Sequence, residues 1–445
     1  DMLSQDSVIK APLHDSVFQL LNNQPKLSFN QEQISSLPFR NLSTFGLMAP
    51  SAYKLKGDRM FYYGIEATGN HTFIDGMQVK DAIGFPKRII QSYNLYPSQT
   101  PINMGFATGA ITSIETLTQL VDFTVLVDVN SDQTYDAQGV AGEIFINIPF
   151  TSKKRKTNAK LVPSLLIAGS YYWTNNTDPV WERTQKLNSE TLAKLNVNPY
   201  RLPTPQSFIE QNSEHVTTSD MIEQKVPDNS GKTGISPFVK LHLPISKNIN
   251  INIGNYSVID ETEMYNRSNS VFNSINNATR SRRNFDTYLN WNHSVEVNDD
   301  LSLNYDINFQ YSNYYTKTRD RNHEDRFFDY GYIGKFTTYK MPTYELGSDS
   351  VDGQYYENVW VLNSWNYDTL VTFEPSNINS RLSAYTSNYY DIYSDFPSQG
   401  HYQTMDDVIM NGGLVNGMNP RSVYGLFNNT GNVTAGYQES SFEKI

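Results

Sequence analysis

Two neighbouring stretches of this sequence alternate between apolar and polar residues over a length unusual for a soluble β-strand. In 301–312 every odd-numbered residue is aliphatic or aromatic, and every even-numbered residue is Ser, Asn, Asp or Gln. The stretch 285–297 largely repeats this alternation, and residues 298–300 between the two are Asn-Asp-Asp. Successive side chains of a strand point to opposite faces. The sequence therefore predicts a long antiparallel hairpin with one apolar face, one polar face and a tight turn.

Other segments of the chain share this pattern. Further strands are predicted over 121–129, 144–150, 161–173 and 239–245. The connections between the predicted strands alternate in length: 151–159, 246–249 and 298–300 are short, and 174–234 and 260–282 are long. Outer-membrane barrels combine strands of about ten alternating residues with short periplasmic turns and longer extracellular loops. The pattern favours a mainly β fold whose residues 119–445 form antiparallel strands and loops of a transmembrane β-barrel.

The composition argues against several other classes of protein. Hydrophobic residues make up 38% of the chain and aromatic residues 13%, which suits strands with only one apolar face. The net charge of −11 gives no basic stripe, so nucleic acid is not expected as a partner. The chain has no cysteine, which excludes disulfides and thiolate chemistry. No run of about 18 apolar residues predicts a transmembrane helix. No motif predicts an enzyme, a cofactor or a metal site.

The remaining segments are less periodic. Residues 1–35 are polar and predict a flexible N-terminal segment, and 36–118 mix short apolar pieces with Gly, Pro and Asn, as in a small α+β domain. Residues 343–436 are rich in Tyr, Asn, Ser and Asp and predict a large loop region. Additional strands are expected over 331–340, 356–362 and 369–373. His323-Glu324-Asp325 could hold a metal, although a solvated charged loop is the favoured interpretation.

Several motifs resemble the plug domain of TonB-dependent outer-membrane receptors of the Bacteroidetes type. Thr72–Val79 contains Ile-Asp-Gly and resembles the plug's strand and turn, and Leu37–Asn41 resembles the entry to these plugs. Pro101–Thr116 resembles the end of the plug, with Ala110 where the family has a second Gly after Thr-Gly. Tyr332–Tyr339 is also similar to a segment of large members of the group. The plug motif residues are Ile74, Asp75, Gly76, Gly105, Thr108 and Gly109.

A short N-terminal segment resembles a TonB box, which pairs with a periplasmic energy transducer by strand addition. Its residues are Ser7, Val8, Ile9, Lys10 and Ala11. The resemblance implies an outer-membrane location, contact with membrane lipid, and an extracellular lipoprotein or other outer-membrane subunits as partners. Such receptors close a barrel of about 22 strands around the plug. The chain is therefore expected to be the N-terminal portion of a longer protein.

Three functions remain open from the sequence. The first is a TonB-dependent transporter that binds a nutrient (a glycan, peptide or metal chelate) and imports it. The second is a non-transporting plugged-barrel subunit of an outer-membrane assembly or secretion complex. The third, which the loop lengths disfavour, is a soluble β-rich binding protein or glycan-processing enzyme.

Overall fold

The computed structural model describes most of the chain between Phe18 and Lys444. The described residues are 18–21, 24–37, 42–50, 52–55, 59–65, 67–80, 82–98, 101, 104, 108–118, 122–134, 137–150, 162–179, 183–201, 210–267, 271–272, 277–298, 301–330, 332–395 and 438–444. Strands dominate, so the prediction of a mainly β protein is confirmed.

The N-terminal unit is a six-stranded sheet with short helices. Its strand order is β1-β2-β7-β8-β5-β6, and only the pairing of β5 with β8 is parallel. The strands are β1 (Phe18–Leu21), β2 (Gln24–Asn30), β5 (His71–Ile74), β6 (Met77–Val79), β7 (Ile90–Tyr96) and β8 (Ile111–Thr116). Helices α1 (Gln31–Ser36) and α2 (Leu42–Gly46) and the hairpin of β3 (Ala52–Leu55) with β4 (Arg59–Tyr62) complete the unit.

The predicted boundary of this unit at residue 36 is wrong. Strand β2 pairs with β7, and Leu27 and Phe29 lie in the core. Phe29 packs against Phe45 and Tyr93, with ring centroids 6.2 and 6.1 Å away. The sequence did not predict strand β2, because only alternate residues of this short polar segment are apolar. Burial of those two side chains places residues 24–36 within the folded unit.

Eight antiparallel strands form a second sheet, here called the wall. Their order is β22-β19-β18-β17-β16-β11-β10-β9. The bounds are β9 (Thr124–Thr134), β10 (Ala137–Pro149), β11 (Ser164–Thr174), β16 (Lys232–Pro244), β17 (Ile249–Glu263), β18 (Thr279–Asn298), β19 (Leu301–Arg319) and β22 (Gln438–Lys444). Strands β18 and β19 form the hairpin predicted from the alternation. Within the described residues, β9 and β22 are the two edges of an open sheet.

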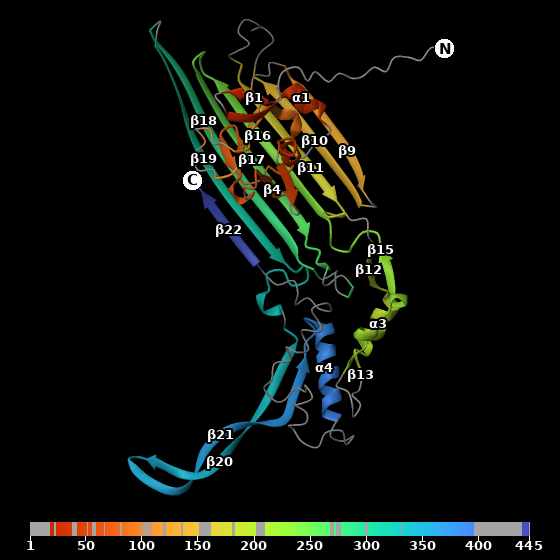
Figure 1. Ribbon diagram of the computed structural model, residues 1–445. Helices are drawn as coiled ribbons and strands as arrows, with labels where there is room; N and C mark the ends of the chain where they lie inside the picture. The colour runs from red at the N-terminus through yellow and green to blue at the C-terminus, as the bar shows by residue number, and fades with distance from the viewer. Residues whose placement is uncertain are drawn as a thin grey trace, which may run out of the picture.

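The two longest connections between the wall strands lie at the same end of the wall. One end has the tight turns 245–248 and 299–300, and the other receives 175–231 and 320–437. Figure 1 shows the elements of both long connections grouped beyond this second end of the wall. They include β12 (Thr184–Leu187), α3 (Ser189–Val197), β13 (Tyr200–Arg201), β14 (Glu210–Gln211) and β15 (Met221–Gln224). The predicted sorting of loop lengths holds for these four connections, but the short turn 135–136 lies at the end with the long connections and 150–163 lies at the end with the tight turns.

The connection 320–437 contains more regular structure than the sequence predicted. Strands β20 (Gly334–Val351) and β21 (Gln354–Pro375) form one long hairpin apart from the wall, and α4 (Ser380–Asp395) follows it. The expected short strands 356–362 and 369–373 are therefore parts of the single strand β21. Three register shifts interrupt this hairpin. They break its period of two, which explains why the sequence showed little periodicity.

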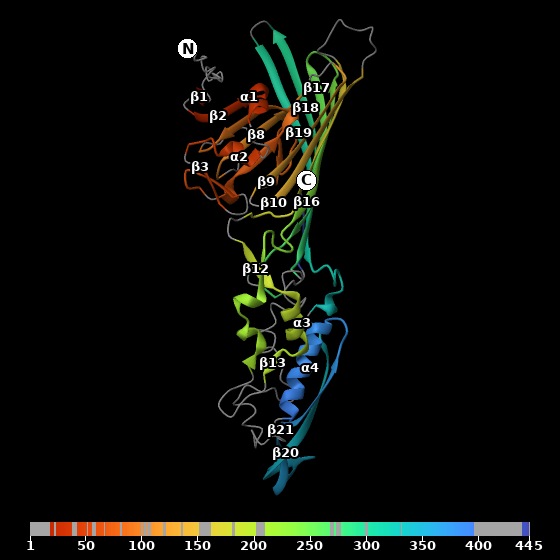
Figure 2. The same ribbon diagram turned by 90° about the vertical axis from the view of Figure 1, so that its right-hand side faces the viewer.

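The N-terminal unit lies against one face of the wall, here called the inner face (Figure 2). The inner face is covered and of mixed polarity. Its buried polar residues are Glu143, Asn147, Ser164, Ser236, Lys240, His242, Asp260, Asn284, Asp286 and Ser312, and its buried apolar residues are Phe145, Leu166, Ala168, Phe238, Tyr256, Val258 and Tyr288. The opposite, outer face is apolar and exposed, with Val125, Val127, Val129, Ile144, Ile235, Ile253, Phe285, Leu303, Ile307 and Phe309. Val129 and Phe309 are 69% and 64% exposed. A water-soluble sheet rarely exposes so many large apolar side chains on one face.

Candidate functional site

The candidate site is the contact between the N-terminal unit and the inner face of the wall. It begins at the turn between β5 and β6, where Asp75 and Gly76 have φ angles of 49° and 84°. Two successive positive φ values are typical of the two-residue turns that close tight hairpins, and Asp-Gly is a preferred pair there. The Ile-Asp-Gly motif thus fixes both the turn and the direction of the Asp75 side chain.

The Asp75 carboxylate joins the N-terminal unit to two wall strands. Lys240 of β16 donates to its Oδ2 at 2.9 Å, and Tyr288 of β18 donates to the same oxygen at 2.6 Å. Thr116 of β8 donates from its backbone N at 2.8 Å and from Oγ1 at 2.6 Å. Lys240 also donates to Thr116 Oγ1 at 2.8 Å. The Lys240 side chain is 2% exposed and that of Asp75 is 11% exposed, so solvent screens this ion pair little.

The environment of Asp75 makes this contact dependent on pH. Burial alone would raise the pKa of Asp75, but the charge of Lys240 and the hydrogen bonds from Thr116 and Tyr288 outweigh it and lower the pKa below its ordinary value. A carboxyl with a lowered folded-state pKa stabilises the structure above its unfolded-state pKa, and this stabilisation is lost as the pH falls through the folded-state value. We therefore expect acid to weaken the contact. Chemical unfolding of the purified protein across an acid series should show less pH dependence in Asp75→Asn than in the wild type.

A second contact is made by the loop that follows β6. The carbonyl oxygen of Ile83 accepts hydrogen bonds from Ser236 Oγ at 2.8 Å and Tyr256 OH at 2.7 Å, and that of Gly84 accepts one from Ser170. Gly84 has a φ of 65°, and a Cβ there would lie 2.8 Å from Tyr172 Cε1. Only glycine fits at position 84, where the loop backbone approaches the wall strands this closely. The wall hydroxyls satisfy the carbonyl groups that the loop buries.

Phe85 anchors the same loop by packing into the wall. Its side chain is 2% exposed and makes edge-to-face contacts with Phe238 and Tyr256, with centroids 5.4 and 5.2 Å away. Both wall rings are fully buried. The core therefore runs from the N-terminal unit into the centre of the inner face.

Further polar contacts extend the interface across the wall. Gln78 and Gln310 of β19 exchange two hydrogen bonds, with Gln78 N donating at 3.1 Å and Gln310 Nε2 donating at 2.6 Å. Arg88 pairs with Asp128 of β9 at 3.3 Å. The N-terminal unit thus holds strands near both edges of the wall. Between the N-terminal unit and the tight turns, hydrogen-bonded side chains form a row along the inner face. The row runs from His242 through Asn252 and Asn290 to Asn308.

The Thr-Gly motif at 108–109 has a structural role within the N-terminal unit. Gly109 N donates to the carbonyl oxygen of Gly69 at 2.9 Å, and Asn70 Oδ1 accepts from Ala110 N at 2.8 Å. A Cβ on Gly109 would lie 2.5 Å from Asn70 Oδ1 and 2.7 Å from the Gly69 carbonyl carbon. The second of these atoms is backbone, so the chain itself would have to move.

We expect Gly109→Ala to destabilise the N-terminal unit by about 1–3 kcal/mol, the usual cost of forcing atoms into a packed site. The matched control is Gly139→Ala in β10, where the nearest atom to a new Cβ is 3.5 Å away. The stability of the unit in both variants is measured by its resistance to protease across a series of urea concentrations. Equal stability of the two variants would contradict this reading of the motif.

The structure places the predicted motif residues in different roles. Ile74 is fully buried in the core of the N-terminal unit, Asp75 faces the wall, and Gly76 completes the turn. Gly105 and the box-like segment 7–11 lie outside the described residues. Sequence reasoning missed Lys240, Tyr288 and the loop 82–85. Lys240 could have been found from its position in the alternation, which places it on the inner face between Phe238 and His242. A lysine on a covered face needs a partner for its charge.

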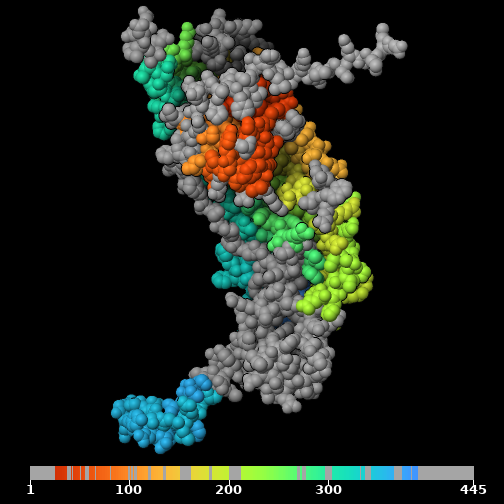
Figure 3. All heavy atoms as spheres, viewed as in Figure 1, coloured from red at the N-terminus to blue at the C-terminus, as the bar shows by residue number. Residues whose placement is uncertain are grey.

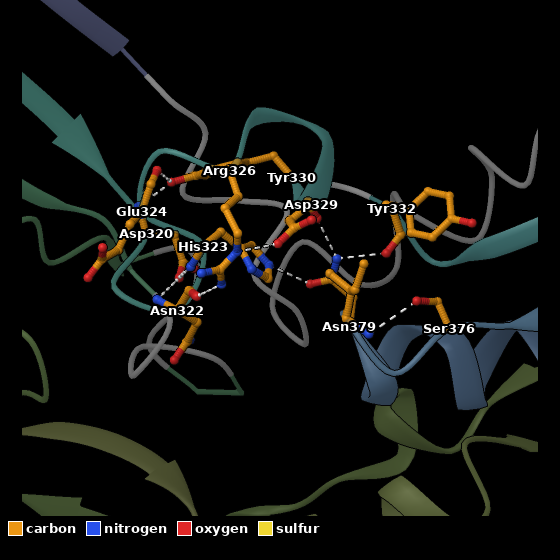
Figure 4. A network of polar contacts seen from close by, with 11 residues as sticks. Asp320, Asn322, His323, Glu324, Arg326, Asp329, Tyr330, Tyr332, Ser376 and Asn379 are labelled. Atoms are coloured by element: carbon orange, nitrogen blue, oxygen red, sulfur yellow. Dashed lines mark hydrogen bonds and ion pairs between the residues drawn. The ribbon is translucent and has the colours of Figure 1, made fainter.

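His323 lies in a hydrogen-bonded network that joins the loop after β19 to the start of α4 (Figure 4). It is 2% exposed, and its Nε2 lies 2.8 Å from Asn379 Oδ1. Asn379 Nδ2 donates to the carbonyl oxygens of Asp329 and Tyr332, each at 2.8 Å. The interpretation of 323–325 as a solvated loop is thus wrong for His323, because its buried side chain contacts the start of α4. Nowhere in the described ranges do three His, Asp or Glu residues gather as a metal site would require.

Of the helices that the structure describes, none combines the length and apolar character needed to span a membrane.

Comparisons with known proteins give matches among solved structures alone. No family model and no curated protein matches the chain. The outer membrane transporter YddB from Escherichia coli aligns with 66% of this chain and 40% of its own, at 10% identity and a TM-score of 0.42. The Ferric-Catecholate import receptor Fiu from E. coli K12 aligns with 66% and 50%, at 10% identity and a TM-score of 0.41.

A third match is the hemophore receptor HasR of Serratia marcescens, solved with its hemophore and heme, at 10% identity and a TM-score of 0.40. It aligns with 66% of this chain and 38% of its own. The chain thus spans half or less of the length of these three structures. All three are named as transporters or receptors.

Proposed function

We propose that the N-terminal unit is the plug, and the wall part of the barrel, of a TonB-dependent outer-membrane transporter. One observation carries the proposal: the wall face that the N-terminal unit covers buries many polar side chains around an apolar patch, whereas the face that nothing described covers exposes large apolar side chains. Lipid is the solvent that suits such an outer face, and a plug suits such an inner face. The protein binds a nutrient at the end with the long connections and passes it through the barrel when the plug is displaced.

In this proposal the segment Ser7–Ala11 recruits the energy transducer. It precedes β1, which lies near the end of the wall with tight turns (Figure 1), the periplasmic end in barrels of this kind. A short extended segment there can add as a strand to a partner's sheet edge. Deletion of 7–11 should abolish uptake of the nutrient and leave the amount of protein in the outer membrane unchanged. Unchanged uptake would favour the non-transporting subunit instead.

Movement of the plug can be tested directly, because the chain has no cysteine of its own. Gln78→Cys with Gln310→Cys places one thiol on each side of the contact, where the two residues exchange hydrogen bonds. A short thiol cross-linker that contains a cleavable disulfide should block uptake, and reduction should restore it. The single Cys variants, treated in the same way, are the controls. Full uptake with the link intact would exclude displacement of this part of the plug.

The hairpin of β20 and β21 is proposed to bind an extracellular protein partner. It stands away from the other described elements in Figure 3 and carries Leu346 and Trp360, paired on one face and 62% and 69% exposed. Isolated two-stranded hairpins are marginally stable, so a partner is needed to cover this face. The hairpin, residues 334–375, contains six carboxylates and two lysines, and this acidic excess favours a basic surface on the partner.

The hairpin is tested by Leu346→Ser combined with Trp360→Ser. We expect this variant to lose a protein that co-purifies with the wild type from outer membranes, and high salt to release the same protein. The control is Phe328→Ser, which changes a residue that is 91% exposed outside the hairpin. Retention of the protein by the double variant would exclude the hairpin as its binding surface.

A further inference from the structure

The inner face carries a cluster of charged side chains beyond the plug, at the end with the long connections. Four wall strands contribute to it through two rows of paired residues. One row is Lys232, Thr262, Arg280 and Thr318, and the next is Gly234, Asp260, Arg282 and Thr316. Tyr172 of β11 pairs with Gly234. Its ring also lies beside Gly84, so the cluster adjoins the tip of the plug.

Asp260 is the carboxylate of the cluster and is almost fully enclosed, with a side chain 3% exposed. Arg282 forms an ion pair with it and also donates from Nε to Oδ1 at 3.2 Å. Lys232 Nζ lies 3.5 Å from Asp260 Oδ2, and Tyr172 OH donates to the same oxygen at 3.1 Å. A Cβ on Gly234 would lie 2.5 Å from the Tyr172 hydroxyl. Glycine is therefore what lets the ring cross β16 to reach Asp260.

The two rows contain three cationic side chains and one carboxylate. Arg280 is exposed, its two row neighbours are neutral threonines, and no described residue forms an ion pair with it. Lys232 and Arg282 remain 21% and 17% exposed although both pair with Asp260. Lys232 Nζ also lies over the Tyr172 ring, 5.3 Å from its centroid. The whole chain has a net charge of −11, so this positive excess is local.

We propose that Arg280, Arg282 and Lys232 form an oxyanion-binding site that selects solutes bearing carboxylate or phosphate groups as they reach the plug. Arginine offers a planar set of donors that matches such groups. Asp260 is a positioning residue, because it orients two of the cations while Arg280 is left to meet the solute. The site deepens the proposed function, on which its role as an entry site rests.

The test is calorimetric titration of the purified full chain in detergent with citrate and, separately, with inorganic pyrophosphate. The uncharged sugar raffinose is the negative probe. We expect Arg280→Gln to weaken binding of the oxyanions about tenfold, the usual loss for one charge-assisted contact, and Arg280→Glu to abolish it. The matched control is Arg283→Gln, an exposed arginine on the same strand whose position in the alternation is the outer face. It should bind as the wild type does.

Binding of neither oxyanion by the wild type, or equal losses in the Arg280 and Arg283 variants, would overturn the proposal. Preference for one of the two probes identifies the carboxylate or the phosphate class. Failure of the transport proposal is distinguishable from failure of this one. Specific binding that depends on Arg280, together with unchanged uptake after deletion of Ser7–Ala11, would remove energised transport and leave the oxyanion site in place.

Discussion

Replacing Asp75 with alanine should detach the N-terminal unit from the wall. The substitution leaves Lys240 with a buried positive charge and removes the acceptor for Tyr288 and Thr116. Breaking a buried ion pair from one side costs about 3–5 kcal/mol, because the remaining charge has no compensation. Protease digestion of the purified protein in detergent should cleave the N-terminal unit of this variant much faster than that of the wild type. The wall strands should remain resistant.

A double-substitution cycle separates the charge from the shape of the side chains. Lys240→Met alone also breaks the pair, whereas Asp75→Asn with Lys240→Met removes both charges and keeps similar volumes. We expect the double variant to be more stable than Asp75→Asn alone, since no buried charge is left unpaired. Strictly additive losses in the two single variants would show that the ion pair does not hold the plug.

Phe85→Ala should have an effect of similar size through packing alone. The side chain fills the space between Phe238 and Tyr256, and its removal leaves a cavity in the centre of the interface. Loss of a buried phenyl ring costs about 3–5 kcal/mol. The carbonyl groups of Ile83 and Gly84 would then be held only by the wall hydroxyls. Hydrogen exchange of residues 82–90 should rise strongly, while exchange in β18 and β19 stays slow.

The control for this prediction is a phenylalanine on the other face of the wall. Phe309 lies on the outer face and is 64% exposed. Phe309→Ala should leave exchange in residues 82–90 unchanged, because that side chain meets detergent or lipid and not the plug. Equal protection of the loop in Phe85→Ala and the wild type would contradict the role given to the ring.

Alternation alone was sufficient to predict the hairpin of β18 and β19. A wall strand has one apolar face and one polar face, so apolar and polar residues alternate along its sequence. The same reasoning failed for β2 and for β20 and β21. In β2 the strand is short and polar on its open side, and in β20 and β21 three register shifts disturb the period. The Ile-Asp-Gly motif correctly predicted a turn, but the sequence did not predict which wall residues the side chain of Asp75 contacts.

The sequence by itself determined the class of secondary structure and the two faces of the long strands, because those depend on residues close together in the chain. Only the tertiary structure decided which face is covered and what meets it. Asp75 contacts Lys240 and Tyr288, which follow it by 165 and 213 residues. No local preference encodes such a pair, because it forms only when the N-terminal unit and the wall come together. The alternating pattern therefore predicted two distinct faces, and the fold alone placed the N-terminal unit on one of them.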